Sequence, residues 1–231
     1  VLSRCLNDEQ MNRHDYIRTN RKNKKSSEKE PHQNQERSSG TQLRTYRLAM
    51  TADTSYCNYF GNTDSAIMSN IVIAINRVNQ VYESEVDIRF IIIGNNDQLF
   101  LDPPLGLGAP TTASLLRNQV ITDSIIGTAN YDIGHYFTIS TGGLAYHGVT
   151  CSPGWKAQGG TGRPIPVGDA FFVDYVCHEM GHQMNAHHTY NQISGNCVIG
   201  QWISATAFEP GSGSTIMSYA GICSAANLQL N

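Results

Sequence analysis

The feature that most constrains this fold is an alternation between two hydrophobic periods, which begins at Leu43 and continues to Ser140. Three segments have the apolar alternation or continuous apolar run of β-strands, namely residues 43–52, 86–93 and 133–140. Two segments between them repeat apolar residues every three or four positions, as amphipathic helices do, namely residues 64–82 and 112–126. This strand–helix–strand–helix–strand order predicts an α/β domain with a mostly parallel sheet.

The chain after Ser140 predicts fewer regular elements. Residues 142–146 (GGLAY) have the composition of a short, flat strand that lies beside the third one. A loop rich in glycine and proline leads to residues 170–184, whose Phe, Val and Tyr residues predict a third helix. Beyond Met184 the sequence indicates only loops and turns, so we expect the domain to be truncated at its C-terminus.

The first 41 residues differ in composition from the rest of the chain. Residues 6–41 offer almost nothing to bury, so we interpret residues 1–41 as a polar linker or prosegment remnant. They contain nine Lys or Arg and six Asp or Glu, a balance of +3, whereas residues 42–231 contain seven and thirteen, a balance of −6. The acidic body argues against nucleic acid as a partner.

The apolar runs and the cysteines indicate in which cellular compartment the protein is found. The longest apolar runs are far too short to cross a bilayer. The first residues, VLSRCLNDEQ, lack the charged start and apolar stretch of a signal peptide, and the chain begins without Met, so we expect a processed or excerpted chain. Six cysteines, an even number, favour an oxidising compartment. We therefore expect a secreted protein, and fifteen disulfide pairings are open at this point. As a separate expectation, the chain is taken to be a monomer.

The most informative motif lies at the end of the third predicted helix. Residues four apart on a helix lie one turn above each other on the same face, so His178 and His182 can present two imidazoles to one metal ion. Glu179 lies beside them, close enough to hold a water molecule on that metal but too constrained to be a ligand. Two histidines on a helix face without a metal are the alternative.

A third ligand is available after the helix. Asn185 follows His182 by three residues, and asparagine tolerates the left-handed conformation in which a helix can end sharply. The chain can then turn back and bring His188 to the metal. His187 is adjacent and should point elsewhere, so the spacing favours His188 over His187.

Two motifs carry a resemblance to a known family. The segment HEMGHQMNAHH, residues 178–188, resembles the H-E-x-x-H-x-x-G-x-x-H signature of the metzincins, with Asn185 where glycine is usual. The segment STIMSY, residues 214–219, resembles their Met-turn. The surrounding FFVDYVCHEMGHQ and EPGSGSTIMSYAGIC resemble the reprolysin-like secreted metallopeptidases of the adamalysin branch. The resemblance covers about residues 42–228.

The resemblance implies a zinc endopeptidase. Its twisted, mostly parallel five-stranded sheet would lie above the active-site helix, with an irregular C-terminal subdomain, and residues 42–231 would form the catalytic domain. Met217 would lie beneath the Zn²⁺ site. Tyr219 follows the Met-turn as in astacins and serralysins, where this tyrosine contacts zinc or stabilises the oxyanion; simple packing beneath the site is the alternative.

The predicted mechanism uses zinc, water and a peptide. Three neutral imidazoles leave Zn²⁺ with an open position for water, and Glu179 would act as the general base and then return the proton to the leaving amine. A protein or peptide substrate would pair with an edge strand formed by Gly142, Gly143, Leu144, Ala145 and Tyr146. The two glycines would allow that approach, or they mark the end of a hairpin.

Two other functions are open. A zinc-containing binding or adhesion module without catalysis is the main alternative, and the presence of Glu179 argues against it. A zinc hydrolase that acts on non-peptide amides is a further alternative, and the Met-turn favours a peptidase over it.

The cysteines raise one further hypothesis. Cys197 and Cys223 bracket the loop between the third ligand and the Met-turn, and we expect them to be disulfide-linked. RCLND, around Cys5, resembles the cysteine switch of matrix metalloproteinases, in which a prosegment thiolate holds zinc latent. In that case Cys177 would be a buried thiol and Cys57 would pair with Cys151; three ordinary disulfides that include Cys5 are the alternative.

Overall fold

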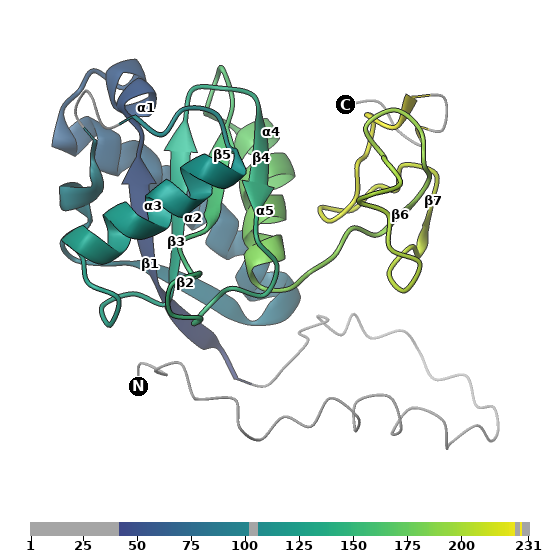
Figure 1. Ribbon diagram of the computed structural model, residues 1–231, viewed down its shortest axis with the longest axis horizontal. Helices are drawn as coiled ribbons and strands as arrows, with labels where there is room; N and C mark the ends of the chain where they lie inside the picture. Colours follow the sequence, from purple (N-terminus) through teal and green to yellow (C-terminus); the bar gives the residue numbers. More distant parts are fainter. Residues whose placement is uncertain (1–41, 102–105, 225–226, 228–231) are drawn as a thin grey trace, which may run out of the picture.

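A computed structural model describes residues 42–101, 106–224 and 227. A five-stranded sheet, in the order β2-β1-β3-β5-β4, forms the body of the protein (Figure 1). Its strands are β1 (Arg44–Ala52), β2 (Ile88–Ile92), β3 (Ile133–Thr138), β4 (Gly142–Ala145) and β5 (Gly159–Gly162). All neighbours pair in parallel except β4, which runs antiparallel to β5 at one edge. The predicted α/β fold with a mostly parallel five-stranded sheet is confirmed.

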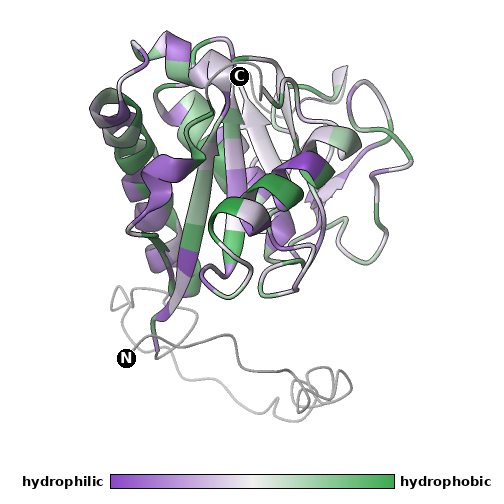
Figure 2. Ribbon diagram, turned by 60° about the vertical axis from the view of Figure 1, so that its left-hand side comes forward, coloured by the Kyte–Doolittle hydropathy of each residue, from purple (hydrophilic) through white to green (hydrophobic). Residues whose placement is uncertain are grey.

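Helices cover both faces of this sheet. On one face lie the long helix α2 (Asp64–Val86) and the helical segment that ends in α5 (His178–Gln183); on the other lies α3 (Thr112–Ile125) (Figure 1). The short α1 (Thr54–Tyr59) and the 3₁₀ turn η2 (Asn96–Leu99) follow β1 and β2. In Figure 2 the strands are mainly green or pale, and purple hydrophilic residues lie mainly on helices and loops.

Threonines cap the two long helices α2 and α3 at their N-termini. Thr63 is the N-cap of α2 and accepts a hydrogen bond from the Ala66 amide, and Thr111 and Ser114 form a capping box at the start of α3. The main core lies between the sheet, α2 and the helical segment that ends in α5. Among the described residues, no helix is both long and apolar enough to cross a lipid bilayer.

The third predicted helix is continuous but not uniform. It consists of α4 (Asp169–Phe171), a π-helical segment η3 (Phe172–Cys177) and α5 (His178–Gln183). π-Helical turns are rare and occur often at functional sites, because the extra residue per turn rotates the side chains that follow. Here that segment comes directly before the first histidine of the motif.

Two elements were missed in the sequence. The segment Gly159–Gly162 (GGTG) is a buried strand, not a loop, and the turn-rich region after β1 contains α1. A Cβ atom at Gly159 or Gly160 would overlap the side chains of Gln183 and Tyr136, respectively. The strand is therefore glycine-rich because neighbouring side chains occupy the space of its own.

The chain after α5 forms a separate layer of loops beside the sheet–helix body (Figure 1). Its described regular elements are the short paired strands β6 (Tyr190–Asn191) and β7 (Glu209–Pro210). The Cys197–Cys223 disulfide holds this subdomain together, as predicted. Closing a loop of this size contributes about 3 kcal/mol in the chain-entropy model.

Candidate metal centre

Helix α5 presents two histidines on one face, and the turn that follows it supplies a third. Met184 ends the helix, and Asn185 adopts a left-handed conformation with φ of 76°. The Asn185 amide donates to the His182 carbonyl (2.8 Å) and the Ala186 amide to the Gly181 carbonyl (2.8 Å), the two bonds of a Schellman motif. The predicted left-handed turn at Asn185 is confirmed, and it directs the chain back towards the helix.

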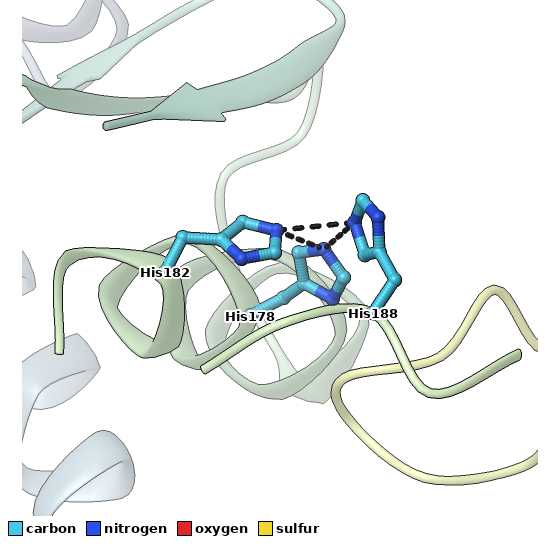
Figure 3. Close-up of side chains that lie close together, drawn as sticks. All are labelled: His178, His182 and His188. Carbon is cyan, nitrogen blue, oxygen red and sulfur yellow. Dashed lines mark hydrogen bonds between the residues drawn. The ribbon is translucent and has the colours of Figure 1, made fainter. Parts of the chain in front are cut away.

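The three imidazoles meet at their Nε2 atoms (Figure 3). The Nε2 atoms of His178 and His182 are 3.0 Å apart, those of His182 and His188 3.1 Å, and those of His178 and His188 3.2 Å. All three side chains are buried. The structure therefore brings together the three histidines that the sequence predicted as ligands.

The other ring nitrogen of each histidine faces a backbone carbonyl. Nδ1 lies 2.6 Å from the Ile216 oxygen in His178, 2.8 Å from the Ala186 oxygen in His182, and 3.2 Å from the Gln201 oxygen in His188. A carbonyl oxygen only accepts hydrogen bonds, so these contacts place the proton of each neutral ring on Nδ1. The three Nε2 atoms are then acceptors that face one another without a proton among them.

This donor set fits a divalent metal ion. Burial lowers the pKa of His178 to about 4 and that of His182 to about 2, so the rings stay neutral and keep their lone pairs. Two ligands of a tetrahedral zinc ion with Zn–N bonds of about 2.0–2.1 Å are separated by about 3.3 Å, close to the observed spacing. Three converging lone pairs repel one another unless a cation lies between them.

His187 lies outside this cluster. Its ring stacks on that of His147, with centroids 4.5 Å apart and an interplanar angle of 18°. The spacing argument from the sequence favoured His188 over this neighbour, and the geometry agrees because His187 contributes no atom to the cluster.

Glu179 lies next to the histidines and against the edge strand. Its side chain lines the same cavity as His182 and His188, and only 7% of its surface is exposed. Burial raises the pKa of Glu179 to about 8, and a cation held by the three histidines would lower it again. A Cβ atom at Gly143 would lie 2.6 Å from the Glu179 Cδ, so glycine at this position makes room for the carboxylate.

Met217 lies directly beneath the histidine pair. A Cβ atom on Gly181, between His178 and His182 in the helix, would be 2.5 Å from the Met217 Sδ, so the thioether packs against that glycine. The neighbouring Ile216 supplies the carbonyl that orients His178. The turn around Met217 thus packs against the helix and holds the His178 ring in place.

Glu209 holds this turn in place. Its carboxylate accepts hydrogen bonds from the Ser214 amide (2.7 Å), from the Thr215 amide (3.1 Å) and from the hydroxyls of Thr189 and Thr215. The Thr189 amide in turn donates to the Met217 carbonyl at 3.0 Å. Glu209 thereby joins the residue after His188 to the Met-turn, a role that the sequence did not indicate because it depends on tertiary contacts.

Tyr219 packs against the cluster from the side of the C-terminal subdomain. Its ring centroid lies 4.6 Å from that of His188 and 5.6 Å from that of His178, and its hydroxyl donates to the Gln201 Oε1 at 3.3 Å. Tyr219 also lines the cavity. Its ring packs beside the histidine cluster, and the role of its hydroxyl stays a prediction.

The predicted substrate strand is the edge strand of the sheet. Gly142, Gly143, Leu144 and Ala145 form β4, and Tyr146 continues its pairing through a 3.0 Å bond from its amide to the Gln158 carbonyl. Because these bonds alternate along an antiparallel pair, the backbone groups of Gly143 and Ala145 point away from the sheet. Gly142 has φ of 86°, which marks the end of the hairpin.

The cysteines differ from one prediction. Cys177 is a buried thiol, as expected for the switch hypothesis, but Cys57 is also a buried thiol, whose Sγ lies 3.5 Å from the Ala52 carbonyl oxygen. The expected Cys57–Cys151 disulfide is therefore wrong, because Cys57 lies beneath β1 in the core. The alternative of three disulfides is also excluded by these two thiols. Cys5 lies outside the described residues.

A buried polar network supports the helix from behind and was missed in the sequence. His135 Nδ1 lies 2.8 Å from the Gln183 Oε1, and its Nε2 lies 2.8 Å from the Thr161 hydroxyl. The Gln183 amide nitrogen donates to the Gly134 carbonyl at 2.8 Å. These bonds tie the end of α5 to β3 and β5. The one signal in the sequence was a histidine within a strand.

A mostly parallel sheet over a helix with paired histidines, and a third histidine after a sharp turn, are typical of a metallopeptidase catalytic domain. This chain belongs to metallopeptidase family M12B, reprolysin-like, because the model of that family matches residues 42–231. The family match confirms the resemblance to reprolysin-like metzincins that the sequence motifs indicated. The comparison with curated proteins finds no match.

Several solved structures are similar to this chain at low identity. One is a chain in a chaperone–substrate complex, at 15% identity and a TM-score of 0.44, over 77% of this chain and 29% of that chain. Two are structures of myroilysin, at 14% and 13% identity and TM-scores of 0.34 and 0.36. They cover 68% and 80% of this chain, and 57% and 78% of theirs.

Proposed function

We propose that this chain is a secreted, zinc-dependent endopeptidase in which Glu179 is the general base. The observation that carries the proposal is the convergence of three Nε2 lone pairs, 3.0–3.2 Å apart, beside a buried carboxylate that lines the same cavity. Membership of a metallopeptidase family supports hydrolysis of peptide bonds. The Cys197–Cys223 disulfide supports an oxidising, extracellular compartment.

His178, His182 and His188 would hold the zinc ion. When bound, zinc supplies a Lewis acid that polarises a peptide carbonyl and lowers the pKa of a water molecule to about 7. Glu179 accepts the proton of the attacking water and returns it to the leaving amine. Glu179 can make both transfers because Gly143 has no side chain, so that the Glu179 carboxylate lies directly against the strand that would bind the substrate.

The substrate would bind as an additional strand along β4. Gly143 and Ala145 would exchange backbone hydrogen bonds with an extended peptide, which suits an endopeptidase because an open edge accepts a chain on both sides of the cleaved bond. On the opposite wall, the Tyr219 hydroxyl would donate to the developing oxyanion after it leaves Gln201.

The Glu179→Gln variant tests this function. The amide cannot accept the water proton, so we expect casein cleavage to fall by about 10²–10⁴-fold while zinc binding is retained. The matched control is Glu83→Gln, which changes a carboxylate on α2 that lies 3.4 Å from Arg89 in an exposed ion pair. Cleavage by Glu179→Gln within tenfold of the wild type would contradict the assigned mechanism.

Casein also separates the competing functions. A binding module, or a hydrolase of non-peptide amides, would hold zinc but leave casein intact. The Cys5 switch remains a separate proposal: before any cleavage of residues 20–25, Cys5→Ala should be active where the wild type is latent. Equal activity of the two would remove Cys5 from the mechanism.

A further inference from the structure

His147 lies at the rim of the cavity, directly after the edge strand. Its ring centroid is 4.5 Å from that of His182, at an angle of 46°, and 4.5 Å from that of His187. The following residues fasten it to the active-site helix, because the Gly148 amide donates to the His182 carbonyl (3.0 Å) and the Thr150 amide to the Gln183 carbonyl (3.1 Å). An exposed imidazole is thus held in a fixed place beside the histidine cluster.

The His147 side chain lies on the side of β4 that faces α5, because its ring contacts that of His182. Leu144 and Tyr146 pack against the apolar cluster beneath α3, whereas the missing side chain of Gly143 faces Glu179. Since side chains alternate along a strand, Gly143 and Ala145 share the face towards α5, where glycine and alanine occupy little space. His147 follows β4 in a turn, and its imidazole lines the same cavity as Glu179 and His182.

If a substrate pairs antiparallel with β4, the direction of its chain determines which substrate residue lies beside His147. Side chains directly opposite in an antiparallel pair lie on the same face, about 4.5–5.5 Å apart at Cβ. Glu179 marks the reacting carbonyl near Gly143, and an antiparallel peptide runs from His147 towards Gly143. The substrate side chain opposite His147 therefore belongs to the amino-terminal side of the cleaved bond.

The surroundings of the ring favour an anionic hydrogen-bond partner. The His147 ring stacks on that of His187 and has a tilted contact with that of His182, and the side chain is otherwise exposed, so that its N–H can reach a substrate. The other wall offers no competing charge, because residues 184–231 contain a single Asp, Glu, Lys or Arg, Glu209. The Glu209 carboxylate is bound within the Met-turn. Hydrogen bonds to a carboxylate are about twice as strong as neutral ones.

We propose that His147 is a specificity-determining residue, which hydrogen-bonds an acidic side chain of the substrate on the amino-terminal side of the cleaved bond. This inference rests on the proposed peptidase function. According to this proposal, the His147 imidazole gives the enzyme a preference for substrates with an acidic residue at one position before the cleaved bond.

Paired fluorogenic peptides test this inference on the full chain. Each pair would differ only by Glu or Leu at one position, scanned over both sides of the cleaved bond. In the wild type we expect kcat/KM to favour Glu about tenfold or more at one amino-terminal position, the effect of a hydrogen bond to a charged group. His147→Phe keeps the ring stack but has no donor, so the preference should vanish; His147→Gln should retain part of it.

The control is His187→Phe, which changes the other member of the stack and should leave the Glu-to-Leu ratio unchanged. An unchanged ratio in His147→Phe, or a preference confined to the carboxyl-terminal side, would overturn the inference while the peptidase function stands. If the wild type cleaved none of the peptides, the proposed function would fail, and this inference with it.

Discussion

Replacing Gly143 by alanine tests how closely the edge strand and the general base fit together. The added Cβ would lie 2.6 Å from the Glu179 Cδ and would also overlap the Cγ and Oε1 atoms of the same side chain. Ordinary contacts of a Cβ begin near 3.4 Å, so the carboxylate must move by about 1 Å. Glu179 is buried and has little room to do so.

The expected loss can be stated in rate and energy. A displacement of about 1 Å in a reacting group can lower the rate about 100-fold, which corresponds to about 2.7 kcal/mol in the activation free energy. Overpacking of a filled site costs a further 1–3 kcal/mol or so of folding stability. The three histidines do not touch the new methyl group, so zinc binding should be retained.

The assay compares kcat on one peptide substrate, zinc content and melting temperature for the wild type, Gly143→Ala and the control Gly94→Ala. Gly94 has nothing within 4 Å of an added Cβ, so its variant should match the wild type. If Gly143→Ala kept kcat within threefold of the wild type, the Glu179 carboxylate would not be held against Gly143. That result would refute the close fit between the general base and β4.

Three further predictions concern the site and its support. His188→Ala should lose zinc whereas His187→Ala should retain it, as metal analysis of both purified variants would show; the reverse pattern would move the third ligand to His187. Glu209→Gln should lower the free energy of unfolding by about 1–3 kcal/mol, because an amide NH₂ would face hydrogen-bond donors at the Met-turn; an unchanged denaturation midpoint would argue against this anchor. Burial lowers the pKa of His135 from its ordinary 6.5 to about 4, so its neutral form stabilises the fold above pH 6.5 and this contribution, about 3 kcal/mol, is lost as the pH falls from 6.5 to 4. His135→Asn should lack that loss relative to the wild type in denaturation series across this range, and parallel curves for the two proteins would contradict it.

Local rules account for the part of the site that the sequence predicts. The helical repeat alone places His178 and His182 on one face, and the tolerance of asparagine for a left-handed conformation accounts for the turn at Asn185. The order of strands and helices follows from hydrophobic periodicity, which reports burial directly. The disulfide between Cys197 and Cys223 follows from their positions around an otherwise weakly structured loop.

The features that the sequence missed depend on contacts between distant segments. Three of the four residues of β5 are glycines, because side chains such as those of Gln183 and Tyr136 fill the space beside the strand, and such a segment has the composition of a loop. Glu209 is a surface-type residue in the sequence, and its four donors become visible only when the Met-turn lies beside Thr189. The even number of cysteines suggested a disulfide for Cys57, whereas its thiol is buried in the core beside the Ala52 carbonyl.

The central claim is that three histidines hold a zinc ion that peptide hydrolysis requires. The most direct measurement is the zinc content of the purified chain, followed in parallel with casein cleavage during removal of the metal by a chelator and its return. The account predicts one zinc ion per chain that His178→Ala and His188→Ala lose, with cleavage that falls and recovers together with bound zinc. Cleavage that persists after the metal is removed, or a chain that binds no zinc, would contradict it.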